Sequence, residues 1–119
     1  MSGALLKLLV LKTNRLEPLC KFYSSLGVEF AVEKHGAGPV HYAGTVGDAV
    51  LELYPLAAGA MADTTAPRLG FAVTDVQRVT AELESLVAKI VSMPRQTKWG
   101  LRAVLNDPDG RPVEIYERQ

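Results

Sequence analysis

Two glutamates stand in otherwise apolar segments, and their side chains are the clearest candidates for chemistry. Glu52 lies within Leu-Glu-Leu and Glu114 within Val-Glu-Ile, 62 positions apart. Alternate side chains of a strand point to opposite faces, so we expect the flanking aliphatic residues to face the core and both carboxylates to face the other side. Carboxylates on such a face can move protons, bind a cationic group or hold a hard metal ion.

Each glutamate is predicted to have a basic partner on a neighbouring strand. A hairpin with an even-length loop would place His41 directly opposite Glu52, and a five-residue loop would place Arg102 opposite Glu114. A histidine held by a carboxylate can serve as a general base, or His41 can be a metal ligand of an unusual kind. Both pairs can also be satisfied polar pairs in a half-buried sheet. We favour the structural role for Glu114 and leave a catalytic role open for Glu52 with His41.

The same alternation surrounds the glutamates with apolar and aromatic side chains. Mostly apolar walls with a few convergent polar groups are typical of a site for a small molecule. Trp99 stands beside a glycine at a strand start, where we expect it to close the mouth of the cleft. The other predicted ligand-binding residues lining the cleft are Leu8, Val50, Tyr54, Leu69, Phe71, Arg102, Glu114 and Tyr116.

The elements that would carry these side chains occur in one order and then again. An apolar strand from residue 5 ends at Asn14, which has the spacing of a capping pair with Glu17, and a helix with an apolar stripe runs from Leu16 to Leu26. Three strands follow, separated by glycine-containing turns. Their expected residues are 28–33, 40–44 and 49–54.

The second half repeats this pattern. A strand ends at Asp75, a helix follows to Leu86, and three strands are expected at residues 90–93, 101–105 and 112–116. Asn14 and Asp75 are 61 positions apart, as are Leu8 and Leu69. The sequence therefore predicts one α+β domain over residues 1–119, built from two βαβββ modules that form a curved mixed sheet with a concave ligand cleft. The expected boundaries are 4–56 for module one, 57–66 for a linker and 67–118 for module two.

Composition excludes several classes of partner. Lysine plus arginine and aspartate plus glutamate each total 13, so we expect no basic field for nucleic acid or anionic lipid. The apolar stretch at residues 4–11 is too short to span a membrane and has no cleavage site after it. The single cysteine, Cys20, cannot form an internal disulfide. We expect a cytoplasmic protein whose partner is a small molecule.

Four stretches together resemble the vicinal-oxygen-chelate superfamily of glyoxalases, bleomycin-resistance proteins and extradiol dioxygenases. The most specific is Asp-Pro-Asp-Gly-Arg-Pro-Val-Glu-Ile-Tyr, a hairpin turn that leads into a strand carrying a glutamate. The four stretches are residues 19–27, 49–55, 99–102 and 107–116. The resemblance implies a glyoxalase-like domain over nearly the whole chain.

The resemblance also implies where a metal would bind. Metal enzymes of this family usually take one ligand from each first strand and a glutamate from each fourth strand. The matching residues here are Leu8 and Leu69 for the first strands, and Glu52 and Glu114 for the fourth. Leucine cannot coordinate a metal, so we expect no metal cofactor; if a divalent metal is bound, Glu52 and Glu114 are its ligands.

Two functions follow from the resemblance. The first is bleomycin-resistance-like binding of a small, partly apolar or planar molecule without a metal. The alternative is a divalent-metal-dependent lyase or isomerase of the glyoxalase type, acting on a vicinal-oxygen substrate with Glu52 and His41 as catalytic residues. Family members commonly pair their modules across a dimer, so we expect a homodimer, with the modules paired either within one chain or between two.

Overall fold

The repeated order of elements predicted from the sequence is present in the computed structural model, which describes residues 3–64, 67–86 and 88–119. The last two residues of the expected linker 57–66 lie outside the described residues. Module one contains β1 (Leu8–Thr13), α1 (Leu16–Ser25), β2 (Phe30–Glu33), β3 (His41–Val46) and β4 (Ala49–Pro55). Module two contains β5 (Leu69–Val73), α2 (Val76–Ser85), β6 (Lys89–Thr97), β7 (Gly100–Asn106) and β8 (Pro112–Glu117).

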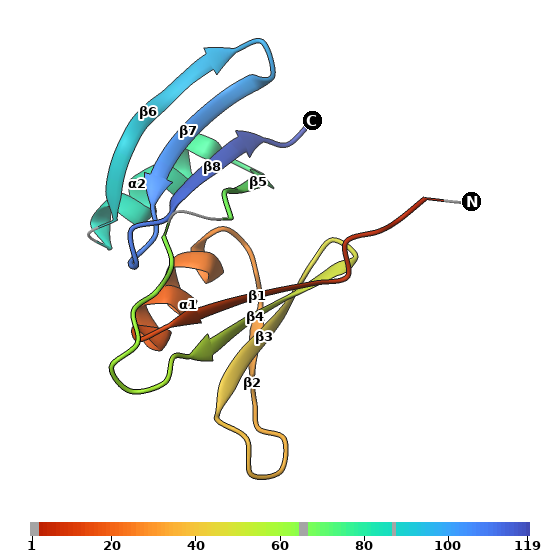
Figure 1. The fold of residues 1–119 in the computed structure, drawn as a ribbon. Helices are drawn as coiled ribbons and strands as arrows, with labels where there is room; N and C mark the ends of the chain where they lie inside the picture. The colour runs from red at the N-terminus through yellow and green to blue at the C-terminus, as the bar shows by residue number, and fades with distance from the viewer. Residues whose placement is uncertain (1–2, 65–66, 87) are drawn as a thin grey trace.

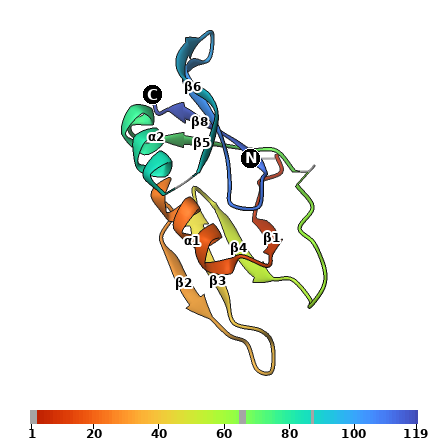
Figure 2. The ribbon, with the colours of Figure 1, turned by 90° about the vertical axis from the view of Figure 1, so that its left-hand side faces the viewer.

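The eight strands are divided between two four-stranded sheets (Figure 1). The strand orders are β1-β4-β3-β2 and β5-β8-β7-β6, and in each sheet the first and fourth strands of the module are parallel. The predicted α+β fold of two βαβββ modules is therefore confirmed. Figure 2 shows the helices of both modules meeting on one side of the molecule, and none of the helices in the described ranges is long and apolar enough to cross a membrane.

A single hydrophobic core connects the two modules. Helix α1 contributes Leu19, Phe22 and Tyr23, while α2 contributes three apolar side chains of its own and the strands supply the remainder. Full burial of one such side chain stabilises the fold by roughly 1.5–3 kcal/mol. The aliphatic neighbours of the two glutamates belong to this core, as alternation predicted; they are Leu51, Leu53, Val113 and Ile115. We call the opposite surface of each sheet, which carries Glu52 or Glu114, the glutamate face.

The starting positions of the two helices differ from those expected from the 61-residue repeat. Asp75 caps α2 by accepting a hydrogen bond from the Arg78 N–H at 3.1 Å, but the N-cap of α1 is Arg15, without a side-chain cap. The predicted capping pair of Asn14 with Glu17 is therefore wrong. The Arg15 N–H instead donates to Thr13 Oγ1 at 2.8 Å. The helices are thus 60 positions apart (76 minus 16), not 61.

The turn between β7 and β8 fastens module two to module one. Arg111, only 3% exposed, donates to Asp107 at 3.0 Å and to Asp109 at 2.8 Å. Tyr23 of α1 donates to Asp107 at 2.7 Å, and Thr13 of β1 donates to Asp109 at 2.9 Å. Burial and the charge of Asp107 raise the pKa of Tyr23, which therefore remains a hydrogen-bond donor. Asp107, Asp109 and Arg111 of the Asp-Pro-Asp-Gly-Arg motif therefore hold the two modules together.

Candidate functional site

The hairpin between β3 and β4 turns one residue later than the sequence predicted. Its two turn residues are Gly47 and Asp48, and Gly47 has a φ of +57°, in the left-handed region that a turn between two paired strands favours. Ala43, and not His41, is therefore opposite Glu52. His41 nevertheless lies near this carboxylate, with 3.9 Å between His41 Nε2 and Glu52 Oε2.

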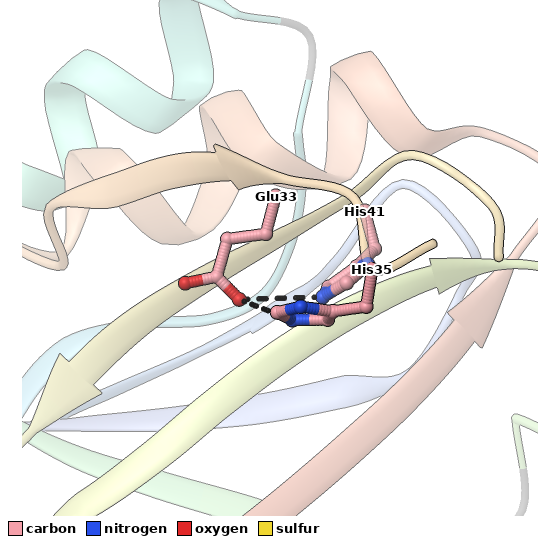
Figure 3. A group of neighbouring side chains, drawn as sticks. All are labelled: Glu33, His35 and His41. Carbon is pink, nitrogen blue, oxygen red and sulfur yellow. Dashed lines mark hydrogen bonds and ion pairs between the residues drawn. The ribbon is translucent and has the colours of Figure 1, made fainter. Parts of the chain in front are cut away.

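His41 is almost completely buried on the glutamate face of module one. Its ring stacks on Tyr54 with 4.1 Å between centroids and 10° between planes. Its Nδ1 lies 3.2 Å from the Pro39 carbonyl oxygen, and its Nε2 lies 3.4 Å from Glu33 Oε1. His35, which sequence reasoning missed, brings its Nε2 within 3.3 Å of the same glutamate oxygen (Figure 3).

The hairpin between β7 and β8 is shifted in the same way. It has the predicted five-residue loop, but one position later, so Val104 is opposite Glu114 and Arg102 is opposite Tyr116. The predicted pairing of Arg102 directly across from Glu114 is therefore wrong. The long side chain compensates for the shift, because Arg102 Nε donates to Glu114 Oε1 diagonally across the strands at 3.1 Å.

Three groups hold the Glu114 carboxylate. Arg102 and the Tyr116 hydroxyl both donate to Oε1, and Arg68 Nε lies 2.6 Å from Oε2. The hydrogen bonds from Tyr116 and Arg102, followed by the charges of Arg102 and Arg68, lower the pKa of Glu114 to about 2. Glu114 is therefore ionised at neutral pH and is a poor proton acceptor. Sequence reasoning missed Arg68. The only feature that could have indicated it is its place immediately before β5.

The first strand of module two faces the opposite way from the prediction. Leu69 and Phe71 pack against the core, and the Phe71 ring lies 5.7 Å from that of Tyr23. Because Phe71 is the parallel partner of Ile115, the two side chains share the core side of the sheet. The prediction that Leu69 and Phe71 line the glutamate face is therefore wrong.

The first strand of module one agrees with the prediction. Leu8 is the partner of Val50, and Val10 is the partner of Glu52, so Leu8 and Val10 lie on the glutamate face. In module two the partner of Glu114 is Gly70. The equivalent first-strand positions are therefore Val10 and Gly70, 60 positions apart like the helices.

Val10 and Gly70 cannot act as ligands in the metal site that is usual for the family. Neither Val10 nor Gly70 carries a donor atom. Glu114 is already held by two arginines and a tyrosine, which leaves Glu52 as the one uncommitted carboxylate of the expected pair. The corrected repeat changes the residues that stand at the ligand positions but still supplies no first-strand ligand.

The glutamate face of module two is hollowed. A space of about 420 Å³ is lined by Trp99, Arg102, Glu114 and Tyr116, which are all predicted lining residues. Trp99 is 67% exposed, and Lys98 Nζ lies 4.6 Å from the centre of its ring. An exposed indole, a phenol and a guanidinium thus meet around one fixed carboxylate.

Two of the other hollows are less suited to be the site. A smaller one of about 130 Å³ lies between the modules and is lined almost entirely by apolar residues of β1, β4 and β5. A wider one of about 780 Å³ lies beside α1, the end of α2 and the β7–β8 turn. We place the candidate site on the glutamate face and not in the widest hollow, because the aspartates there are already bound by Arg111 and Tyr23.

The chain belongs to the Glyoxalase/Bleomycin resistance protein/Dioxygenase superfamily, whose family model matches residues 6–115. No curated protein sequence gives a significant match. Among solved structures, the chain is similar to a glyoxalase/bleomycin resistance protein from Albidiferax ferrireducens T118, with 20% identity, a TM-score of 0.75, and 98% and 100% of the two chains covered.

Two further structures share the fold. One is TnmS3, an antibiotic-binding protein from Streptomyces sp. CB03234, with 20% identity, a TM-score of 0.72, and 100% of this chain and 99% of that chain covered. The other is a lactoylglutathione lyase from Agrobacterium tumefaciens, with 18% identity, a TM-score of 0.65, and 98% and 96% covered. Binding proteins and enzymes both use this fold, so the site must decide between them.

Proposed function

We propose that this protein binds a small, planar and partly apolar molecule on the glutamate face, and that binding needs no metal at the family's ligand positions. The observation that carries the proposal is the arrangement of Glu114 between Arg68 and Arg102, beside Tyr116 and Trp99. An exposed aromatic surface next to a fixed polar group suits a planar ligand with one polar edge.

The charges of this arrangement indicate the polarity of the ligand. Two guanidinium groups face one carboxylate, which leaves one net positive charge. Arg102 also lies over the Tyr116 ring, with 6.0 Å between its guanidinium carbon and the ring centre. Because Glu114 is already satisfied, we propose that the ligand presents an anionic or carbonyl oxygen to the arginines, and not a cation to the carboxylate.

The single tryptophan allows a direct test. We expect the planar anion 8-anilinonaphthalene-1-sulfonate to quench Trp99 emission saturably, and Arg68→Ala to weaken this binding by about tenfold, the cost of one charge-assisted contact. Arg78→Ala is the matched control, since Arg68 and Arg78 are 59% and 61% exposed and Arg78 lies on α2. Equal binding by the Arg68→Ala and Arg78→Ala variants would refute the proposed site.

A glyoxalase-type lyase or isomerase is the second candidate. The observation in its favour is the buried His41, whose Nε2 lies 3.4 Å from Glu33 and 3.9 Å from Glu52. A histidine between carboxylates can relay a proton. Turnover of a hemithioacetal that is lost in the Glu52→Gln variant would favour this candidate, whereas equal rates in wild type and variant would exclude Glu52 as the base.

We further propose a cytoplasmic homodimer that binds neither nucleic acid nor membrane. The balanced charge supports the exclusion of nucleic acid. Exposed leucines support the dimer, because Leu5, Leu6 and Leu8 are 71%, 69% and 52% exposed along and before the edge strand β1. Apolar side chains at an unpaired strand edge favour association with a second chain.

A further inference from the structure

Both histidines of the chain lie in one cluster on the glutamate face of module one (Figure 3). Glu33 at the end of β2 is the register partner of His41 at the start of β3. His35 lies in the turn between these strands, with its ring centre 5.3 Å from that of His41. Donor atoms of all three residues lie within 4.8 Å of one another.

The ring of His41 is fixed so that one nitrogen lacks a partner. The Pro39 carbonyl near Nδ1 can only accept a hydrogen bond, so Nδ1 carries the hydrogen, and in the neutral ring Nε2 has a lone pair. His41 is 1% exposed, and its Nε2 is a buried atom with no hydrogen-bond partner. This lone pair faces oxygens of Glu33 and Glu52, which are themselves acceptors. A positive charge between these atoms would satisfy the nitrogen and both carboxylates at once.

The distances match the spacing of metal ligands better than that of a short charge-assisted hydrogen bond. A charge-assisted N–H···O bond to a carboxylate is about 2.7–2.9 Å long, whereas His41 Nε2 lies 3.4 Å from Glu33 and 3.9 Å from Glu52. Ligands of a tetrahedral zinc ion, bound at about 2.0–2.1 Å, are about 3.3 Å apart. The Glu33 oxygen lies 3.3 Å from His35 Nε2 and 3.4 Å from His41 Nε2.

We propose that Glu33, His35 and His41 form a binding site for a divalent transition-metal ion of the zinc, cobalt or nickel type. Two imidazoles and a carboxylate are a ligand set that these ions favour, and three protein ligands leave a fourth position for water or a small molecule. The His35 side chain, which is 74% exposed, can close on an ion without disturbing the core. Stacking on Tyr54 holds the buried ring of His41 in place.

This site differs in position from the family's metal site. It lies on β2, β3 and their connecting turn, whereas the family's ligands come from the first and fourth strands of each module. Glu52 on β4 is a further carboxylate nearby, with its Oε2 3.9 Å from His41 Nε2. The site does not depend on the proposed ligand hollow, which is formed by residues of module two.

Titration of the untagged protein with CoCl₂ tests the site. We expect one equivalent to bind with the visible absorption of tetrahedral Co²⁺, and one equivalent of ZnCl₂ to displace it. In histidine NMR spectra, Zn²⁺ should shift the signals of both rings. His35→Ala should weaken Zn²⁺ binding at least about tenfold, while Lys34→Ala, an exposed neighbour in the same turn, should bind like the wild type.

Several results would overturn the proposal. These are failure to saturate at one equivalent, Zn²⁺ affinity unchanged by His35→Ala, and an equal loss of affinity in Lys34→Ala. Because His35 is exposed, its substitution should leave the circular dichroism spectrum unchanged. Glu33→Gln provides a second variant with an unchanged side-chain shape, and it should also lower the Zn²⁺ affinity.

Discussion

Replacing Arg111 with alanine should weaken the contact between the two modules and lower the free energy of unfolding. In the wild type its guanidinium is 3% exposed and binds Asp107, Asp109 and the carbonyl of Lys12 at 3.0, 2.8 and 2.9 Å. Burial by itself would lower the pKa of Arg111, but its hydrogen bonds to the aspartates and their charges raise it, so the group remains charged. Arg111→Ala leaves two buried carboxylates, 0% and 2% exposed, without this partner.

Loss of one partner from a buried ion pair costs about 3–5 kcal/mol. A domain of this size is typically stable by about 5–15 kcal/mol, so the variant should lose a large fraction of its free energy of unfolding. At about 4 °C per kcal/mol, the melting temperature should fall by about 12–20 °C. Thermal and urea unfolding followed by circular dichroism would measure both quantities.

The control is Arg78→Ala, because Arg78 forms an exposed ion pair with Glu82 on α2. Its loss should cost less than about 1 kcal/mol. Arg111→Lys should recover only part of the stability, since an ammonium group cannot reproduce the planar fork that bridges two aspartates. A loss below about 1 kcal/mol in Arg111→Ala would refute the proposed role of the turn.

Three further predictions concern the glutamate face and the strands. Folding lowers the pKa of Glu114 to about 2, so the stabilising effect of its carboxylate is present above the unfolded pKa and is lost as pH falls toward 2. Unfolding measured at several pH values should therefore show Glu114→Gln less stable than wild type at pH 7 but nearly equal at pH 2. A difference in stability that does not change with pH would contradict the assignment. Gly44→Ala should destabilise by about 1–3 kcal/mol, because the added Cβ would lie 2.7 Å from a Val28 methyl, whereas Gly70→Ala meets nothing closer than 3.7 Å and should be tolerated in the same urea unfolding assay. Leu8→Asp should weaken the proposed homodimer in sedimentation velocity, and an unchanged dimer would exclude β1 from the interface.

The core-facing sides of β4 and β8 could be predicted from the sequence because these strands contain charged as well as aliphatic residues. A lone glutamate between aliphatic neighbours identifies the core side at once, and Leu51, Leu53, Val113 and Ile115 are all buried. Strand β5 offers no such marker. Its sequence Leu-Gly-Phe-Ala-Val is entirely nonpolar, so an error of one position in aligning the repeats reverses every side chain.

The register of the hairpins could not be read from turn composition alone. Moving the turn by one residue shifts each cross-strand pair by two, which replaces His41 with Ala43 opposite Glu52. Side-chain length limits the consequence, because Arg102 still reaches Glu114. The sequence therefore predicted which side chains lie near each other more accurately than which residues stand directly opposite across the strands.

By itself, the sequence determined the two βαβββ modules and the placement of both glutamates away from the core, whereas the first-strand residues beside the glutamates, Val10 and Gly70, were identified only by the strand register. Periodicity and turn residues act over a few positions, and the chain records them directly. Only the tertiary structure decided which groups meet: Arg68 reaches Glu114, and the turn after β2 brings His35 to Glu33 and His41. Those contacts depend on register and on the path of a loop, which are fixed by the packing of the whole fold and not by any local pattern.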